Sequence, residues 1–136
     1  MGDHCENPRM RTLGSVSGLK IYLVCGQCVR DAIDLEFTMG GNHGAYPKYV
    51  PKGEIWLDDA MNGFDATATC LHELVERDQM LHHRLGYDRA HVVANSFERP
   101  FRKEMAKKPP KAFDAKRVQA AFDAYLKKHP APRTAR

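Results

Sequence analysis

The chain has 136 residues, a length that fits one domain with a hydrophobic core of its own. Hydrophobic residues make up 43% of the sequence and charged residues 28%, proportions typical of a soluble globular protein. No apolar run approaches the roughly 18 residues of a membrane helix, and the first residues lack the apolar segment of a signal peptide. Four cysteines are too few for a secreted disulfide framework. We therefore expect a cytoplasmic protein without a membrane partner.

The net charge of +4 conceals a difference between the two parts of the chain. Residues 1–98 hold 9 Lys and Arg against 14 Asp and Glu, whereas residues 99–136 hold 12 against 3. Such a basic C-terminal segment suggests contact with nucleic acid or another acidic partner. A lysine-rich helix surrounded by solvent accounts for the same pattern.

The N-terminal half has the composition of strands joined by loops. Residues 1–10 are predicted to be disordered. Residues 39–53 are rich in glycine and proline, which predicts a surface loop. Apolar, β-branched and aromatic stretches predict strands at 19–24, 33–38 and 54–58.

The next segment predicts two helices. Asp65 is suited to cap a helix that ends near Leu85, before Gly86. Asp88 is suited to cap a second helix, which Pro100 is expected to end or kink. The apolar positions of the first helix follow helical spacing and predict a core face made of Leu71, Leu74, Val75, Leu81 and Leu85.

The end of the chain predicts a linker and a last helix. KKPPK at 107–111 has the chemistry of a linker, and residues 112–128 predict an amphipathic helix with basic flanks. Strands followed by helices favour an α+β fold. We expect one domain over residues 11–106, followed by the linker and basic helix in 107–136.

Cys25 and Cys28 have the C-x-x-C spacing of redox and zinc-binding motifs. A redox motif should open a helix, whereas these two residues stand between predicted strands, so we interpret them as bracketing a turn. A structural metal site is the alternative, and its further ligands would be His4 and Cys5. Cys70 is expected to be a small buried residue.

ATCLHELVER, residues 68–77, begins like the zinc-binding signature HExxH but has Glu76 in place of the second histidine. Residues four apart lie on one face of a helix, so His72 and Glu76 can bind one ion together. Glu73 would flank that ion without being a ligand. A catalytic zinc site has three protein ligands and an open position, so the third ligand has to come from another element.

The following segment, YDRAHVVANSFE at 87–98, offers two candidates for that third ligand. His91, Asn95 and Glu98 share one helix face, which can point at His72 if the two helices pack antiparallel. His91 would complete a His₂Glu set, the ligand chemistry of many zinc peptidases. Glu98 is the rival, and a set with two carboxylates suits Mn²⁺ or Fe²⁺ better than Zn²⁺.

Residues 54–99 resemble the strand–helix unit of the zincin peptidases, above all the small ImmA/IrrE-type members. In those proteins the second helix carries a Glu ligand where this chain has His91, and Ala94, Asn95 and Phe97 stand at matching offsets. The segment also looks like uncharacterised phage and prophage proteins that have HExxE followed by YDxAHxxAxxxE. The residues that match this second pattern are His72, Glu73, Glu76, Tyr87, Asp88, Ala90, His91, Ala94 and Glu98.

The resemblance implies a small zincin-like domain that binds Zn²⁺, with Mn²⁺ or Fe²⁺ as alternatives, and hydrolyses a protein or peptide substrate of narrow specificity. Glu73 would take a proton from the attacking water and pass it to the leaving amine. Tyr87 and His43 are candidates to stabilise the oxyanion. The alternative is a non-catalytic phage accessory protein that binds a metal, a nucleic acid or a protein on the same scaffold.

The aromatic residues between the predicted strands and helices suggest a substrate cleft. Tyr46, Tyr49 and Trp56 are candidates to line it. In zincins an edge strand beside the active-site helix pairs with an extended substrate, so the resemblance implies this role for residues 54–58.

Overall fold

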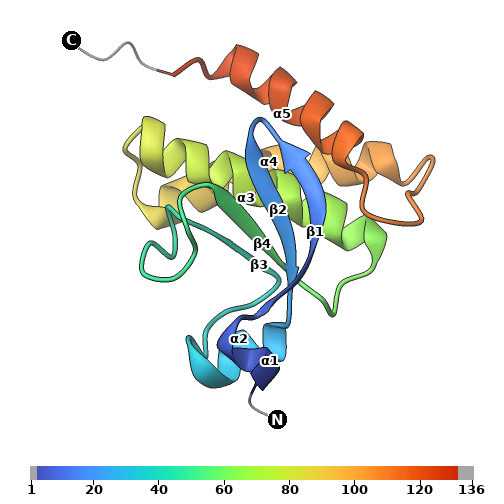
Figure 1. Cartoon of the computed structure of the whole chain (residues 1–136). Helices are drawn as coiled ribbons and strands as arrows, with labels where there is room; N and C mark the ends of the chain where they lie inside the picture. Colours follow the sequence, from blue (N-terminus) through green and yellow to red (C-terminus); the bar gives the residue numbers. More distant parts are fainter. Residues whose placement is uncertain (1–2, 132–136) are drawn as a thin grey trace.

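A computed structural model describes residues 3–131 of the chain and shows an α+β fold (Figure 1). A four-stranded mixed sheet is covered on one face by the long helices. The elements in chain order are α1 (Asp3–Glu6), β1 (Arg9–Val16), β2 (Leu19–Val24), α2 (Gly26–Ala32), β3 (Gly40–Asn42), β4 (Glu54–Asp58), α3 (Gly63–His82), α4 (Tyr87–Met105) and α5 (Ala115–Lys128).

The sheet has the strand order β1-β2-β4-β3. β1 and β2 form an antiparallel hairpin through a turn at Ser17 and Gly18, both of which have positive φ. β4 then pairs in parallel with β2, after a connection that contains α2. β3 pairs antiparallel with β4 and forms the second edge of the sheet. The strand before α3 is therefore an interior strand, not an edge.

The side chains of β4 alternate between two hydrophobic clusters, as a strand buried on both faces requires. Ile55 and Leu57 pack in the larger cluster, which includes the apolar residues of α3. Trp56 points to the other face and packs with Tyr46 and Tyr49. The sheet is thus fixed from both sides directly before α3 begins.

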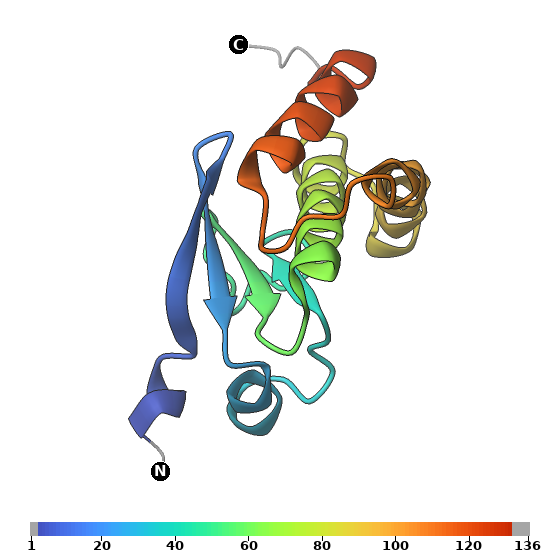
Figure 2. The same ribbon diagram turned by 90° about the vertical axis from the view of Figure 1, so that its right-hand side faces the viewer.

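The helices form two further layers over the sheet (Figure 2). α3 lies against the sheet, and α4 packs on the far side of α3. α5 packs on α3 and β1 and buries Val118, Phe122 and Tyr125 in the larger cluster. The linker and basic helix predicted for 107–136 are therefore joined to the same core, with residues 132–136 outside the described part.

Several predictions for the N-terminal half are wrong. Within the described part of 1–10, residues 3–6 form α1 and β1 begins at Arg9. The C-x-x-C segment does not bracket a turn, because Cys25 caps α2 and Cys28 lies inside it. Residues 33–38 form no regular strand, and Ile33 and Leu35 are exposed although their alternation suggested a buried face.

The predicted strands at 19–24 and 54–58 are confirmed, and residues 107–111, the predicted linker, contain no helix or strand. The predicted helices are also present, but their ends differ. Asn62 caps α3 by accepting the Asp65 N–H at 2.8 Å, and α4 starts after Gly86 instead of Asp88. α4 runs through Pro100, whose ring lies at an exposed position. No helix among the described residues is long and apolar enough to cross a membrane.

Candidate metal centre

His72, Glu76 and His91 come together where α3 and α4 pack. His72 Nε2 lies 3.2 Å from Glu76 Oε2 and 3.1 Å from His91 Nδ1. His91 Nδ1 lies 2.9 Å from the same Glu76 oxygen. His72 and Glu76 are buried and His91 is partly buried, so the three atoms form a possible metal-binding triad inside the protein.

The spacing of these three atoms fits a small divalent ion. Two ligands of a tetrahedral Zn²⁺ with bonds of about 2.0–2.1 Å lie about 3.3 Å apart, close to the separations of the triad. The donor set, two imidazoles and one carboxylate, is one that catalytic zinc sites use. Because three protein ligands leave a fourth position free, the set also fits an open site.

The second nitrogen of His72 is held by a carboxylate. His72 Nδ1 lies 2.8 Å from Glu98 Oε1, and Arg102 Nε donates to the other Glu98 oxygen at 2.6 Å. Arg102 also donates to Asp65 Oδ1 at 2.8 Å, which joins the start of α3 to α4. Glu98 therefore orients His72 and leaves Nε2 for an ion, the arrangement found around metal-binding histidines.

Glu73 and Glu76 share one hydrogen-bond donor. Asn42 Nδ2 donates to Glu73 Oε1 at 2.7 Å and to Glu76 Oε1 at 3.0 Å. Asn42 Oδ1 accepts the Ala45 N–H, which fixes the orientation of the amide. The edge strand β3 thus supplies one buried amide that positions the carboxylates of Glu76 and Glu73 together.

The ionisable groups of the site have strongly shifted pKa values. Burial and the nearby charge of Glu76 raise the pKa of Glu73 to about 8. Burial alone would lower the pKa of His72. The hydrogen bonds with Glu76 and Glu98 have a larger combined effect and raise this pKa to about 10. Burial also opposes ionisation of Glu76, yet its bonds with His72 and His91 lower the pKa of Glu76. Without an ion, a proton on His72 supplies the positive charge that the carboxylates require.

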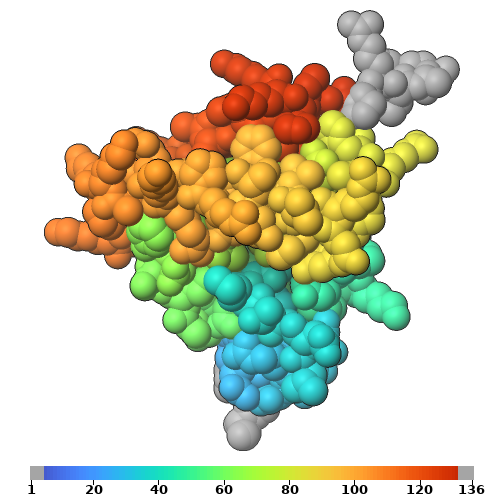
Figure 3. Space-filling model, turned by 180° about the vertical axis from the view of Figure 1, so that it is seen from behind, coloured from blue at the N-terminus to red at the C-terminus, as the bar shows by residue number. Residues whose placement is uncertain are grey.

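The triad lies at a cavity of about 310 Å³. In Figure 3, α4 crosses the front of the molecule above the segment that leads into β3, and these two elements supply much of the cavity wall. Tyr87 stacks on His91 with ring centroids 5.4 Å apart. The cavity is lined by Thr38, Met39, Gly40, Tyr46, Thr69, His72, Glu73, Glu76, Tyr87, His91, Asn95 and Glu98.

Two predicted site residues lie differently from the expectation. Glu98 supports His72 and is not a member of the triad, so His91 is the third candidate ligand. His43 is absent from the cavity lining, and its Nδ1 lies 2.9 Å from the Val50 carbonyl oxygen. Of the two residues expected to stabilise an oxyanion, only Tyr87 lines the cavity.

The predicted substrate strand is also corrected. β4 is paired on both sides and Trp56 is buried, so β4 cannot pair with a substrate. The sheet edge next to the cavity belongs to β3, whose Gly40 is part of the lining.

Two residues of the site, Asn42 and Arg102, were not identified from the sequence. Asn42 stands next to His43, the residue singled out in that loop, and only the pairing of β3 with β4 places its amide over α3. Arg102 lies four residues after Glu98, a spacing that indicates an ion pair on one helix. Tyr46, by contrast, was predicted to line a cleft, and it does line the cavity.

Comparison of the chain with protein-family models, curated proteins and solved structures found no significant match. The function therefore has to be argued from the site itself.

Proposed function

We propose that the protein is a metal-dependent hydrolase of peptide or amide bonds, with His72, Glu76 and His91 as the metal ligands. The main support is the convergence of these three side chains at ligand spacing, next to a second buried carboxylate. When bound, Zn²⁺ would polarise a carbonyl group and lower the pKa of a water molecule. Mn²⁺ and Fe²⁺ remain alternatives for the ion.

Glu73 is suited to move the proton in such a reaction. Glu73 lines the cavity beside the triad, and the residue is 7% exposed. A raised pKa of about 8 lets this group gain and lose a proton near neutral pH. It would accept a proton from the attacking water and deliver it to the nitrogen of the leaving amine. The Asn42 amide keeps one carboxylate oxygen in place during both transfers.

Two tyrosines are suited to the substrate. Tyr87 and Tyr46 line the cavity. Burial, and then the negative charge of Glu73, raises the pKa of Tyr46 to about 12, and burial also raises the pKa of Tyr87. Both phenols are therefore protonated at neutral pH and can donate a hydrogen bond to an oxygen that becomes negative. The two tyrosines make the cavity lining partly aromatic, which favours a restricted range of substrates.

The substitution Glu73→Gln tests the proposal. The wild-type protein is expected to bind one equivalent of Zn²⁺ in the triad and to cleave members of a mixed peptide library, measured by mass spectrometry. Glu73→Gln should keep the metal and reduce cleavage about 10²–10⁴-fold, because the proton carrier is lost. Glu76→Gln is the matched control on the same helix and should lose the metal as well as the activity.

Two results would contradict the hydrolase. A wild-type protein that takes up no metal in the triad argues against a metal enzyme of any kind. A wild-type protein that binds the metal but cleaves no peptide or amide favours the non-catalytic binding protein on the same scaffold.

A further inference from the structure

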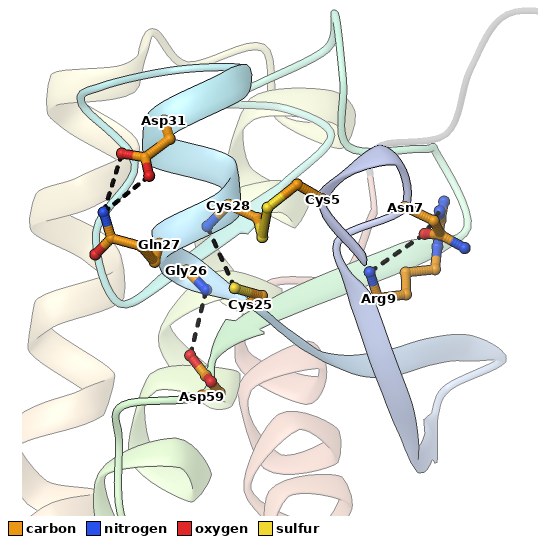
Figure 4. Close-up of a disulfide and its surroundings, with 9 residues drawn as sticks. All are labelled: Cys5, Asn7, Arg9, Cys25, Gly26, Gln27, Cys28, Asp31 and Asp59. Carbon is orange, nitrogen blue, oxygen red and sulfur yellow. Dashed lines mark hydrogen bonds between the residues drawn. A yellow bond between two sulfur atoms is a disulfide. The ribbon is translucent and has the colours of Figure 1, made fainter. Parts of the chain in front are cut away.

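Three of the four cysteines meet at α1 and α2, at the end of the molecule away from α3 and α4 (Figures 1 and 4). Cys5 lies in α1, Cys25 caps α2 and Cys28 lies in the first turn of α2. Cys5 and Cys28 form a disulfide, with Cα atoms 5.0 Å apart. Cys25 has a free thiol, and its Sγ accepts the Cys28 N–H at 3.3 Å.

The strand pairing, and not the disulfide alone, brings these residues together. The β1–β2 ladder ends with Arg9 opposite Val24. Residues before Arg9 and after Val24 therefore leave the sheet side by side. The Cys25 N–H also donates to the Pro8 carbonyl oxygen at 2.8 Å. The approach of Cys5 to the C-x-x-C segment is thus built into the hairpin.

A third cysteine, Cys25, accompanies the two that form the disulfide. Cys25 is only partly exposed, and its sulfur lies 3.3 Å from the backbone nitrogen of Cys28, one of the two disulfide partners. Its sulfur accepts the backbone N–H of Cys28, which keeps the Cys25 side chain beside the first turn of α2. Two cysteines at C-x-x-C spacing plus a third from another segment are a common ligand pattern of structural zinc sites.

A cross-link between α1 and α2 would stabilise the short N-terminal segment. α1 has only four residues, too few for a stable isolated helix. Among the described residues of segment 3–8, none belongs to either hydrophobic cluster of the core. A metal ion bound by Cys5 of α1, by Cys28 of α2 and by Cys25, which caps α2, would link the two helices as the disulfide does. All three sulfur atoms would then be ligands.

We propose that Cys5, Cys25 and Cys28 form a second metal site, for a thiophilic divalent cation such as Zn²⁺, once the disulfide is reduced. An external dithiol supplies two electrons and two protons to the Cys5–Cys28 bond and is itself oxidised to a disulfide. Binding of the cation to the three sulfur atoms then releases the thiol protons. The fourth position is open to water or another donor. This site is separate from the triad and does not depend on the proposed hydrolase.

Titration with Co²⁺ tests the proposal, because thiolate ligands give an absorption band in the near ultraviolet that imidazole and carboxylate ligands do not. The full-length protein is reduced under anaerobic conditions, and three reactive thiols at these positions are confirmed by alkylation and peptide mapping. We expect the sulfur-to-cobalt band to saturate at one equivalent for this site, and bound Zn²⁺ to slow alkylation of all three cysteines. The oxidised protein should show no band.

Substitutions separate the two metal sites. Cys25→Ser removes one of the three sulfur ligands and should abolish the band at one equivalent of Co²⁺, whereas the triad keeps its own ion. Cys70→Ala, which changes the buried cysteine of α3, and His91→Ala, which disrupts the triad, should both retain the band. Circular dichroism confirms that each variant is folded.

Three results would overturn the proposal. The first is a reduced, folded protein that shows no sulfur-to-cobalt band. The second is an unchanged band in Cys25→Ser. The third is a disulfide that cannot be reduced without unfolding the protein, since the cysteines would then serve only as a covalent link.

Discussion

The two nitrogens of the His72 ring face different groups. Nε2 faces Glu76 and His91, whereas Nδ1 faces Glu98. A neutral imidazole carries one proton, and a carboxylate beside Nδ1 favours the tautomer with the proton on that atom. Nε2 is then free to donate its electron pair to an ion. In the proposed metal centre, Glu98 is therefore a positioning residue for His72 and is not itself a ligand.

We expect Glu98→Gln to weaken Zn²⁺ binding about 10–100-fold, since a neutral amide orients and polarises His72 less strongly than a carboxylate. Competition with a chelator of known affinity measures this change. Glu104→Gln is the control, because Glu104 lies on the same helix but its side chain is 74% exposed and forms an ion pair with exposed Lys107. Equal affinities for the two variants would mean that Glu98 does not support the site.

At the scale of elements, the site depends on the close approach of β3 to α3. A Cβ atom added to Gly40 would lie 3.0 Å from the Trp56 carbonyl oxygen, 3.1 Å from Thr69 Cγ2 and 3.2 Å from Glu73 Cγ. The absence of a side chain at Gly40 therefore lets the edge strand reach the helix. This contact is what places Asn42 over the two carboxylates.

We expect Gly40→Ala to lower the free energy of unfolding by about 1–3 kcal/mol, because the extra methyl group overpacks the contact between β3 and α3. Gly53→Ala is the control, since a Cβ atom there meets no atom of the described residues within 4 Å. Urea unfolding of both variants without metal measures the difference. A Gly40 variant as stable as the Gly53 variant would show that the helix and the strand can move apart at no cost.

Two of the four strands could be predicted from the sequence. β2 and β4 are short apolar stretches and were predicted within their bounds. β1 was missed because seven of its eight residues are at least partly exposed, so it lacks the apolar pattern of a half-buried strand. Residues 33–38 have that pattern, but exposed Ile33 and Leu35 make no core contact there. Local alternation predicts a strand only where the fold supplies a partner.

The same distinction applies to the candidate site. The pairing of His72 with Glu76 can be predicted from helical spacing alone, because residues four positions apart lie next to each other on one face of a helix. His91 needed the assumption that α3 and α4 pack antiparallel, an assumption that the sequence permits but does not require. Asn42 could not be predicted, because its role depends on the register of β3 against β4 and on the packing of both over α3.

At the scale of the whole molecule, a buried group of charges is held in a fold of only 136 residues. Glu73 and Glu76 are both buried on α3, and His72 lies between Glu76 and Glu98. Burying like charges is unfavourable unless a proton or a cation balances them. In the metal-free protein this balance comes from protons on His72 and Glu73, so the stability of the fold depends on pH.

The sign of this dependence follows from the two raised pKa values. The pKa of His72 rises from an ordinary 6.5 to about 10 on folding, so its proton stabilises the fold fully below about pH 6.5, and this contribution is lost as the pH rises to about 10. The pKa of Glu73 rises from 4.5 to about 8, so its contribution is present below about pH 4.5 and is lost as the pH rises to about 8. Both changes destabilise the metal-free protein as the pH increases.

A bound metal ion should oppose this loss of stability at higher pH, because the ion replaces the proton of His72 and supplies the positive charge itself. We expect the difference in Tm between Zn²⁺-loaded and metal-free protein to grow between about pH 6 and 8, as proton competition weakens and metal affinity increases. Thermal unfolding at constant free Zn²⁺ and with a chelator measures this difference at each pH. Glu76→Gln, which lacks one ligand, should show little Zn²⁺-dependent change in Tm at any of these pH values. A difference that stays constant or shrinks with pH in the wild type would mean that the ion does not displace the His72 proton, and that the triad is a buried network of ion pairs instead of a metal centre.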